Sequence, residues 1–338
     1  MNSINIKEGD KKILFISPVF FGYYKEIISE LKKMGFNVTF FADAPSNSNF
    51  SKAIGRISKK FLTINSWYYY KKNIYPIILN RDFDYVFIIG GMTFALKPSM
   101  IDEIRTYNPN AKFILYQWDS ERNLPYSKQI HKYFDKIYSF DMIDCQTNDI
   151  YKFLPLFYTE MFENLGKQEN CEFKYDCSYI GTAHPKKFHD INAMAEALKK
   201  IFPNQFIYHY MPSKLKFVYH KILAPEFSKA RYSDFMTNKL SFDQVLDIIK
   251  KSKCILDAPQ EGQSGLTIRT IECLGAKRKL ITTNNTVKNF DFYNPDNILV
   301  IDDHVDFNLP FFSTSYKPID NLVYKKYSLK NWLYTVLS

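Results

Sequence analysis

The chain lacks the features that define several protein classes. No stretch of its 338 residues approaches the roughly 18 to 20 uninterrupted apolar residues of a membrane-spanning helix, and no signal-peptide run opens it. Low-complexity tracts and short-period repeats are also missing. The five cysteines are an odd number without metal-like C-x-x-C spacing. These absences exclude a disulfide-stapled miniprotein and predict a globular protein of the cytosol with reduced thiols.

The composition is that of an ordinary folded protein with an excess of positive charge. Apolar residues make up 46% and charged residues 24% of a chain long enough for two domains. Lysine plus arginine number 45 against 35 acids, a formal net charge of +10. This charge favours anionic partners: nucleic acid, lipid headgroups or a phosphorylated substrate. No helix-turn-helix, zinc-finger or RNP-type aromatic motif is present, so we expect no nucleic-acid partner.

Part of the positive charge is concentrated in one aromatic segment. Residues Ala44 to Arg81 contain seven basic residues and no acid, and the run Trp67 to Tyr70 lies among them. Basic residues attract anionic headgroups, and Trp and Tyr suit an amphipathic boundary. The segment is therefore interpreted either as a peripheral contact with an anionic membrane or as an ordinary solvated face with its aromatics turned to the core.

Apolar runs and helical periodicity alternate along the first half of the chain. This alternation predicts a parallel sheet covered by helices. We expect strands at Lys12–Ser17, Val38–Phe41, Tyr85–Ile89, Lys112–Gln117 and Lys136–Phe140, and helices at Tyr23–Met34 and Lys97–Tyr107. Parallel sheets bind ligands at the carboxyl ends of their strands. Residues Pro18 to Gly22, Gly90 to Thr93 and Gln117 to Arg122 should then line one crevice.

A second cycle of strands and helices begins near Tyr175. The polar stretch Glu163 to Glu172 before it is typical of an interdomain linker. We expect strands at Cys177–Ile180, Gln205–Tyr210, Cys254–Asp257 and Lys279–Thr283, and helices at His189–Ile201, Phe242–Lys251, Leu266–Leu274 and Leu329–Leu337. The fold class is α/β, with two doubly wound halves.

The most informative stretch connects the strand ending at Asp257 to the helix that follows. The loop holds Gly262, Ser264 and Gly265, and the helix start offers free amides and a positive dipole end that suit a diphosphate. Arg269 lies in the first turn, where an external anion would help to explain it. Glu272 follows three residues later and could accept hydrogen bonds from a ribose. An Arg269–Glu272 ion pair, worth roughly 0.2 to 0.5 kcal/mol, is the alternative.

These residues carry a resemblance to a known family. The segment Gln263 to Asn284 resembles the donor-binding segment of bacterial GT-B glycosyltransferases of capsule, exopolysaccharide and lipopolysaccharide biosynthesis, including relatives of the spore-coat CgeB group. The similarity spans most of the chain. Further segments resembling the same family are Phe21–Ile27, Trp118–Ser120, Ser139–Asp144, Phe153–Tyr158 and Tyr175–His184.

The resemblance implies two Rossmann-like domains facing a central cleft. The N-terminal domain, residues 1–165, would bind the acceptor, and the C-terminal domain, residues 173–325, the nucleotide sugar. Residues 326–338 would form a C-terminal helix that packs back on the N-terminal domain. Glu272 is then assigned to the ribose and the helix start to the diphosphate, and the donor-binding residues are Gly181, Thr182, His184, Gln263, Ser264, Gly265, Leu266, Thr267, Arg269 and Glu272. Retaining enzymes of this fold usually carry two glutamates eight residues apart, whereas Glu261 lies eleven before Glu272, which leaves the stereochemistry open.

The chemistry of transfer requires a neutralised leaving group and, for inversion, a base. Arg269 and the helix amides can neutralise the diphosphate, with Thr182 and His184 reaching the same phosphates. His184 could equally be a surface loop residue. Asp119 is the candidate base because it follows a strand at the crevice end, beside Trp118; it could instead cap a turn through Ser120. Asp141 and Asp144 compete with it.

The predicted function is a glycosyltransferase of the hexosyltransferase type. It would move a sugar from a nucleotide diphosphate, UDP first, to a hydroxyl of a glycan or lipid-linked acceptor in the cytoplasm or at the inner face of the membrane. No D-x-D motif follows a strand, so we expect no cofactor and no obligatory metal. The alternatives are a sugar-nucleotide 2-epimerase of the same fold and a non-catalytic subunit that binds glycan or membrane.

Overall fold

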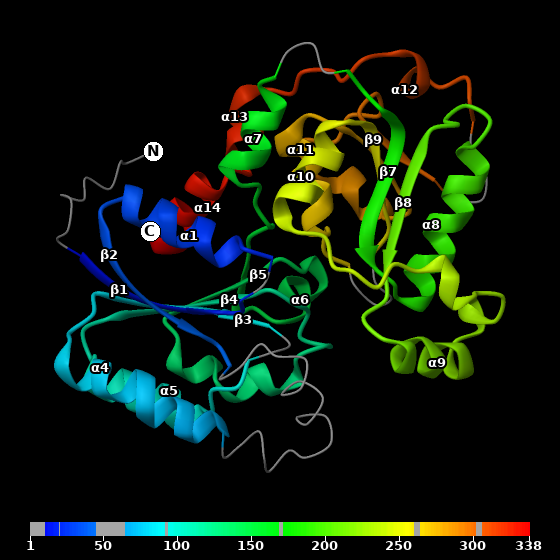
Figure 1. Cartoon of the computed structure of the whole chain (residues 1–338). Helices are drawn as coiled ribbons and strands as arrows, with labels where there is room; N and C mark the ends of the chain where they lie inside the picture. Colours follow the sequence, from blue (N-terminus) through cyan, green and yellow to red (C-terminus); the bar gives the residue numbers. More distant parts are fainter. Residues whose placement is uncertain are drawn as a thin grey trace. The chain divides into compact units, whose positions relative to one another are not determined.

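The computed structural model describes residues 11–19, 21–44, 65–91, 94–168, 172–259, 264–301 and 306–338 (Figure 1). It divides the chain into two compact units. Unit 1 comprises Met1–Pro155 and Trp332–Ser338, and unit 2 comprises Leu156–Asn331. Each unit is built on one parallel sheet with helices packed against it, as the alternation in the sequence predicts.

The sheet of unit 1 has six parallel strands in the order β2-β1-β3-β4-β5-β6. Its central strand β3 is buried along its whole length, because helices cover both faces of the sheet. The chain order reverses between β1 and β3. The strands are β1 (Lys11–Ser17), β2 (Phe36–Ala42), β3 (Tyr85–Gly90), β4 (Lys112–Gln117), β5 (Lys136–Ser139) and β6 (Tyr151–Phe153).

The helices of unit 1 bury one apolar stripe each. In α1, Tyr23, Ile27 and Leu31 are spaced four residues apart and all three are buried. Helices α4 and α5 cover the opposite face from α1 (Figure 1). The helices of this unit are α1 (Tyr23–Lys33), α4 (Tyr75–Asn80), α5 (Pro98–Tyr107) and α6 (Met142–Thr147).

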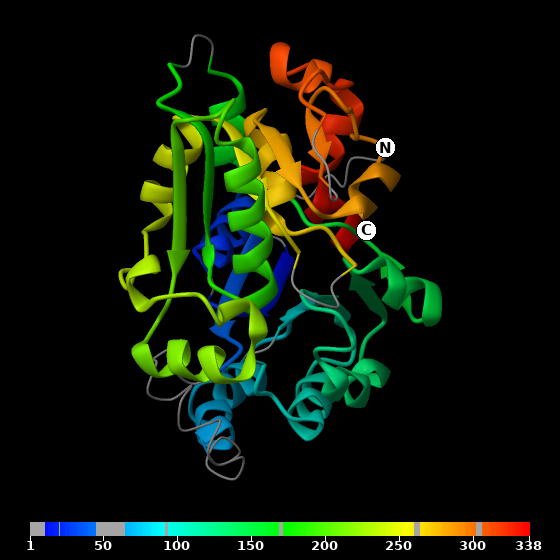
Figure 2. The same ribbon diagram turned by 90° about the vertical axis from the view of Figure 1, so that its right-hand side faces the viewer.

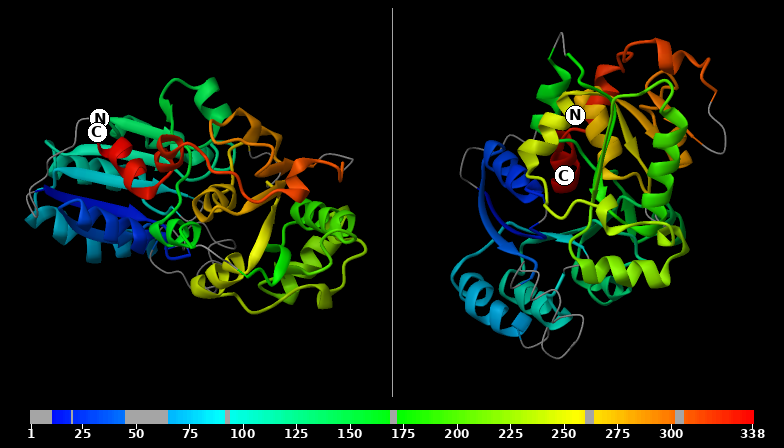
Figure 3. Two further views of the ribbon diagram at one scale, coloured as in Figure 1. Left: turned by 90° about the horizontal axis from the view of Figure 1, so that it is seen from above. Right: turned by 45° about the vertical axis from the view of Figure 1, so that its right-hand side comes forward.

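The last helix, α14 (Leu329–Leu337), has the bounds that the sequence predicts. Trp332 is fully buried, its ring 4.7 Å from that of Tyr116 and 6.0 Å from that of Phe87. Figure 3 shows this red helix beside the strands of the first sheet. The residues from Trp332 onward therefore complete the core of unit 1.

The sheet of unit 2 has five parallel strands in the order β11-β10-β9-β7-β8 (Figure 2). The strands are β7 (Tyr175–Thr182), β8 (Gln205–Tyr210), β9 (Ser252–Asp257), β10 (Lys279–Thr282) and β11 (Ile298–Val300). The helices are α7 (Glu160–Gly166), α8 (Pro185–Leu198), α9 (Lys214–Leu223), α10 (Phe242–Lys250), α11 (Ile268–Ala276), α12 (Pro310–Ser313) and α13 (Asn321–Lys326). Helix α8 begins four residues before the predicted start, because proline is well suited to the first helical position.

The predicted linker Glu163 to Glu172 is wrong in its first part. Residues up to Gly166 belong to α7, and the division between the units follows Pro155 rather than residue 165. The polar composition reflects an exposed helix surface, where Lys167 pairs with Glu163 at 2.9 Å. A polar face on a short helix and a linker look alike in sequence.

Helices α7 and α11 approach each other through two glycines. A Cβ atom on Gly166 would lie 2.4 Å from the carbonyl oxygen of Gly275, and one on Gly275 would lie 2.5 Å from Cγ of Tyr158. Both distances are shorter than van der Waals contact allows. The close approach of α7 to α11 therefore requires glycine at position 166, and the packing of α11 against the Tyr158 ring requires glycine at position 275.

We predict that Gly275→Ala destabilises the protein by about 2 kcal/mol or more, because the added methyl group overlaps the buried Tyr158 ring. Urea unfolding followed by circular dichroism measures the loss. The control is Ala193→Val on the exposed face of α8, which should cost less than about 1 kcal/mol. Equal losses for the two variants would contradict the steric explanation.

Candidate functional site

The chain order of unit 2 reverses between β7 and β9. Strand β8 lies on one side of β7, and β9, β10 and β11 lie on the other. The ladder between β7 and β9 stops at the pair Ser178 and Ile255, before β7 ends. Ligands of open α/β sheets bind beyond the carboxyl ends of the strands at such a point. The polar side chains that follow β7 and β9 are therefore the first candidates for a binding site.

Asp257, the last residue of β9, connects two helices at this point. One carboxylate oxygen, Oδ1, lies 3.2 Å from Nζ of Lys187 on α8. The other, Oδ2, accepts a hydrogen bond from the hydroxyl of Thr267, the N-cap residue of α11. Asp257 is buried, so its charge is stabilised by these partners rather than by water. The carboxylate thus holds both Lys187 and the start of α11 at the carboxyl end of the sheet.

His184, the N-cap residue of α8, lies in a positive environment. Burial, together with the charges of Lys216, Lys187 and His220, lowers the pKa of His184 to about 4. The imidazole is therefore neutral at pH 7 and can donate or accept one hydrogen bond at each nitrogen. Cations gathered in a partly buried place favour a bound anion.

Tyr179 on β7 contributes a buried hydroxyl. Among the residues that the structure describes, this hydroxyl has no hydrogen-bond partner. Burial raises the pKa of Tyr179, and the nearby charge of Asp257 raises it further. A Cβ atom on Gly181 would lie 2.2 Å from this hydroxyl. The absence of a side chain at Gly181 makes room for the Tyr179 hydroxyl. The contact of Gly181 with the donor stays a prediction.

Arg269 and Glu272 form the ion pair that the sequence offers as an alternative. Nη1 of Arg269 lies 2.7 Å from Oε2 of Glu272, with side-chain exposures of 18% and 2%. A pair this buried is costly to break, because removal of one partner strands the other charge. The assignments of Arg269 to the diphosphate and Glu272 to the ribose stay predictions.

The loop before α11 contains the remaining predicted donor residues. Gln263 lies outside the described residues, as do Glu261 and Gly262. The Ser264 carbonyl accepts a hydrogen bond of 3.0 Å from the Thr286 hydroxyl. Leu266 is buried, so its side chain belongs to the core and any ligand contact there would be made by the backbone. The helix begins at Ile268, two residues later than predicted, because Thr267 caps it.

In unit 1, loops at the carboxyl ends of neighbouring strands lie close together. A Cβ on Gly91 would lie 3.2 Å from Cγ of Pro18, and one on Gly90 would lie 2.8 Å from Oε1 of Gln117. The Trp118 amide donates to the Gly90 carbonyl at 2.8 Å. The expectation that these loops are neighbours is confirmed for their described residues; Phe20, Met92 and Thr93 lie outside the description.

Asp119 occupies this end of the sheet and caps a turn. Its Oδ1 accepts hydrogen bonds from the Ser120 amide at 2.9 Å and from the side-chain amide of Asn123 at 2.8 Å. Burial raises the pKa of Asp119, and the nearby charge of Asp141 raises it as well. The turn-capping interpretation is confirmed. Since both hydrogen bonds fall on one oxygen, the cap is compatible with proton transfer at the other.

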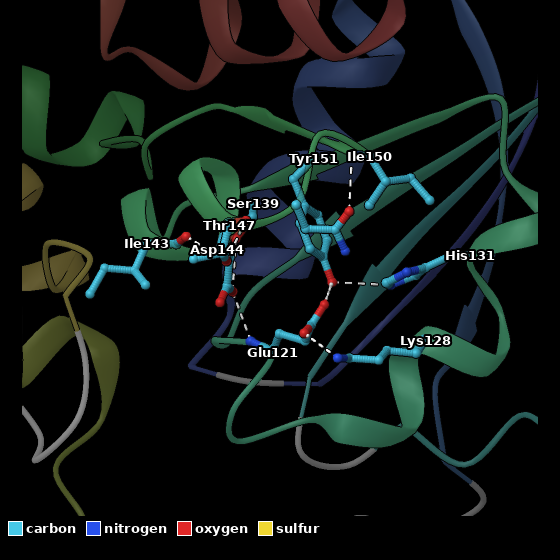
Figure 4. A network of polar contacts seen from close by, with 10 residues as sticks. Glu121, Lys128, His131, Ser139, Ile143, Asp144, Thr147, Ile150 and Tyr151 are labelled. Atoms are coloured by element: carbon cyan, nitrogen blue, oxygen red, sulfur yellow. Dashed lines mark hydrogen bonds and ion pairs between the residues drawn. The ribbon is translucent and has the colours of Figure 1, made fainter.

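Asp144, on α6, is another candidate base (Figure 4). Its Oδ2 accepts a hydrogen bond of 2.7 Å from the Glu121 amide. Burial, together with the charges of Asp141 and Glu121, raises the pKa of Asp144 to about 6 despite this hydrogen bond. Asp141 instead caps α6 by accepting from the amides of Ile143 and Asp144. The Asp144 carboxyl can thus take up a proton at mildly acidic pH.

A hydrogen-bonded network surrounds Glu121 (Figure 4). Its carboxylate accepts from the Tyr151 hydroxyl at 2.8 Å and pairs with Lys128 at 2.7 Å. His131 lies 3.2 Å from the same Tyr151 hydroxyl. These contacts lower the pKa of Glu121 against the opposing effect of burial. The network fixes the loop that carries the Glu121 amide to Asp144.

The basic aromatic segment is described from residue 65 onward. Trp67 and Tyr68 are exposed, whereas Tyr70 is fully buried and Tyr69 donates a hydrogen bond to the Ala42 carbonyl. Two of the four aromatics thus face outward and two face inward, and residues 45–64 lie outside the description. Tyr69 and Tyr70 turn toward the core, as the second interpretation expects, and the membrane contact stays a prediction.

Other sequence expectations can be compared with the described residues. Four cysteines, at 145, 177, 254 and 273, are free. Within the described ranges, no cluster of three or more His, Cys, Asp or Glu side chains is placed to hold a metal ion. Of the helices described, none combines the length and apolarity that crossing a membrane demands.

Two residues of the site in unit 2 were missed by the sequence analysis. Lys187 lies before the helix that we expected to start at His189, so it was given no role, and Asp257 was taken only as the end of a strand. A polar residue at the last position of a buried strand is the signal that identifies Asp257. Lys187 had no such signal, because its neighbour Lys186 is identical and pairs with Asp190 on the surface.

Comparison with known proteins identifies the fold. The chain matches no protein-family model and no curated protein. A glycosyltransferase from Rickettsia africae ESF-5 is similar in structure, with a TM-score of 0.57, 14% identity and coverage of 97% of each chain. An alpha-glucosyltransferase in complex with UDP and a 13-mer DNA containing a central A:G mismatch has a TM-score of 0.53 and 13% identity, over 86% of this chain and 81% of that one. The chain therefore has the GT-B fold of two Rossmann-like domains.

We predict that Asp144→Asn stabilises the protein at pH 8 and has little effect near pH 4. Between the ordinary pKa of aspartate and the raised value of about 6, the folded state keeps a proton that the unfolded state has lost, so stability falls as pH rises. At pH 8 the buried charge is fully present. Asparagine removes it while retaining an oxygen for the Glu121 amide, a gain of about 1 to 2 kcal/mol. Urea unfolding at both pH values measures the difference.

The control for this prediction is Asp102→Asn on the exposed face of α5. This substitution also removes one negative charge, but the carboxylate that it removes is not buried. A gain for Asp144→Asn that is the same at both pH values would contradict the titration argument.

Proposed function

We propose that the protein is a glycosyltransferase that moves a sugar from a nucleotide diphosphate, UDP first, to a hydroxyl of a glycan or lipid-linked acceptor. The GT-B fold supports this proposal, since both similar structures are described as glycosyltransferases. The role we infer is in the assembly of a bacterial surface polysaccharide, at the cytoplasmic side of the membrane. The donor is assigned to unit 2 and the acceptor to unit 1.

One observation carries the proposal: a partly buried lysine, a neutral histidine and the starts of two helices lie where the chain order of unit 2 reverses. Lys187 is held by Asp257 at 3.2 Å, and its side chain is only 15% exposed. His184 and Thr267 lie at the starts of α8 and α11, so two helix N-termini accompany the lysine. Ammonium, imidazole, hydroxyl and backbone amides together suit a diphosphate.

The leaving group determines what these residues would do. As the bond between the anomeric carbon and the diphosphate breaks, negative charge grows on the departing phosphate. Lys187 and the amides at the start of α11 are already oriented, because Asp257 and the Thr267 cap hold them. They would stabilise this charge without rearrangement. Arg269 joins them only if the donor displaces its present partner Glu272.

The base belongs to unit 1 in this proposal. Asp119 and Asp144 both have raised pKa values, so either can accept a proton from an acceptor hydroxyl more readily than an ordinary carboxylate. Asp119 is the more exposed of the two and remains our first choice. No metal or other cofactor is included in the proposed reaction.

Thermal stabilisation by nucleotides tests the donor site. We expect UDP to raise the melting temperature of the wild type more than GDP, TDP or CMP does. Lys187→Gln should weaken UDP binding by about tenfold or more, because a partly buried cation on the diphosphate is lost. The matched control is Lys186→Gln, whose side chain pairs with Asp190 on the surface and should leave UDP binding unchanged.

The outcomes separate the proposal from its rivals. Equal loss of binding in both lysine variants would contradict the assignment of Lys187. If no nucleotide diphosphate stabilises the wild type, the proposed function fails. Free sugar or an epimerised donor formed without acceptor would indicate the epimerase, and binding without any turnover would indicate the non-catalytic subunit.

The base is tested by transfer with a competent acceptor. We predict that Asp119→Asn lowers kcat by about 10² to 10⁴-fold with little change in UDP affinity, because the base acts only in the chemical step. Asp144→Asn is the matched comparison, since its carboxyl is also raised in pKa but accepts from the Glu121 amide. A loss confined to Asp144→Asn would transfer the role to that residue.

A further inference from the structure

Helix α9 exposes an apolar stripe. Leu215, Val218, Tyr219, Ile222 and Leu223 follow the spacing i, i+3, i+4, i+7, i+8, which places them on one face. All five are exposed, and the side chains of Leu215 and Ile222 are the most open, at 81% and 75%. A soluble helix normally buries such a face. We name these five residues the α9 stripe.

The opposite face of α9 is anchored to the rest of unit 2. The Phe217 ring lies 5.5 Å from that of Tyr232 and 5.6 Å from that of Phe235, within an aromatic cluster that includes Phe227. Lys221 donates hydrogen bonds to the carbonyls of Ser228 and Ala230. The helix is therefore held in place by its inner face, and the α9 stripe is not needed for that packing.

Positive charge surrounds the stripe. Residues 214–231 contain five basic residues and one acid, Glu226. Lys214 and Lys229 are exposed, and Lys216 is half-buried beside the inner face. Apolar residues on one side of a helix with lysines around them match a surface of anionic lipid, which offers both a hydrocarbon boundary and negative headgroups.

We propose that the α9 stripe docks unit 2 on an anionic membrane surface, with Leu215, Ile222 and Leu223 entering the headgroup boundary and the lysines pairing with lipid phosphates. Helix α9 lies beyond the carboxyl end of β8, at the same end of the sheet as His184 (Figure 2). Contact with lipid would therefore occur on the side of unit 2 that carries the proposed donor residues. A helix of ten residues is too short to span the bilayer, so the contact is peripheral.

Cosedimentation with vesicles tests the proposal on the full-length protein. We expect binding to phosphatidylcholine vesicles that contain phosphatidylglycerol, weaker binding to phosphatidylcholine alone, and loss of affinity as salt rises. The triple variant Leu215→Ser, Ile222→Ser, Leu223→Ser should lower the partition coefficient at least about tenfold. The control is Leu322→Ser on α13, a leucine that is 80% exposed outside this stripe and should bind as the wild type does.

A second experiment tests which part of the protein contacts the vesicles. Tryptophan in place of Ile222 (Ile222→Trp) should show a blue-shifted emission on addition of anionic vesicles, because the indole leaves water. The double variant Trp67→Ser, Tyr68→Ser removes the exposed aromatics of unit 1 and should retain most of the binding. Circular dichroism confirms that each variant is folded.

Three results would overturn the proposal. The triple variant could bind vesicles as the wild type does, or binding could depend only on Trp67 and Tyr68. The wild type could instead fail to bind vesicles and form a dimer, while the triple variant stays monomeric. That result would make the α9 stripe an interface between two copies. Because vesicle binding is measured without donor or acceptor, its failure leaves the proposed transfer reaction standing, and failure of UDP binding leaves the membrane contact standing.

Discussion

The buried carboxylate of Asp257 is the constraint on which the proposed donor site depends. It is the last residue of a central strand, and its two oxygens hold the ammonium of Lys187 and the hydroxyl that caps α11. A carboxylate buried in this way requires partners, since isolated it would be neutralised or would destabilise the fold. The same contacts that satisfy Asp257 therefore determine where the lysine and the helix start lie. The contacts that stabilise the buried carboxylate also determine the arrangement of the proposed donor-site residues.

Unit 1 uses burial in a different way. There Asp119 and Asp144 lie at the end of the sheet, and burial and repulsion from neighbouring carboxylates raise their pKa values. Glu121 shows the contrast, because Lys128 and Tyr151 lower its pKa a few ångströms along the same network. The two units thus place carboxylates at equivalent ends of similar sheets, in unit 2 beside a lysine and in unit 1 beside other carboxylates. Perturbed groups of this kind favour a functional interpretation over a purely structural one.

Much of the fold could be predicted from the sequence because buried strands are short apolar runs that the sequence shows directly. Lys112–Gln117 and Gln205–Tyr210 are found with the predicted bounds, since each is a short apolar run between polar turns. Three-residue strands such as Ile298–Val300 have no period to detect. Helix α9 was missed for another reason: its apolar residues are periodic, but its inner face carries the apolar Phe217 as well, so the contrast between an apolar and a polar face is weak.

The site could be predicted less completely, because pair contacts depend on distances that spacing does not encode. The Arg269–Glu272 pair was foreseeable, since three residues along a helix bring two side chains together. The choice of Lys187 over Lys186 depends on one step of helix rotation, which turns one lysine to Asp257 and the other to solvent. Because the predicted start of α8 was four residues too late, the different directions of Lys186 and Lys187 could not be predicted.

The connection between the units has a consequence for how the protein is made. The chain leaves unit 1 after Pro155 and returns at Trp332, whose indole completes the core between Phe87 and Tyr116. During synthesis, the ribosome must therefore produce all of unit 2 before unit 1 can close. Until then the first sheet would expose an apolar hollow to other nascent chains and to chaperones. Unit 1, although most of it is synthesised first, is thus the unit that completes its core last.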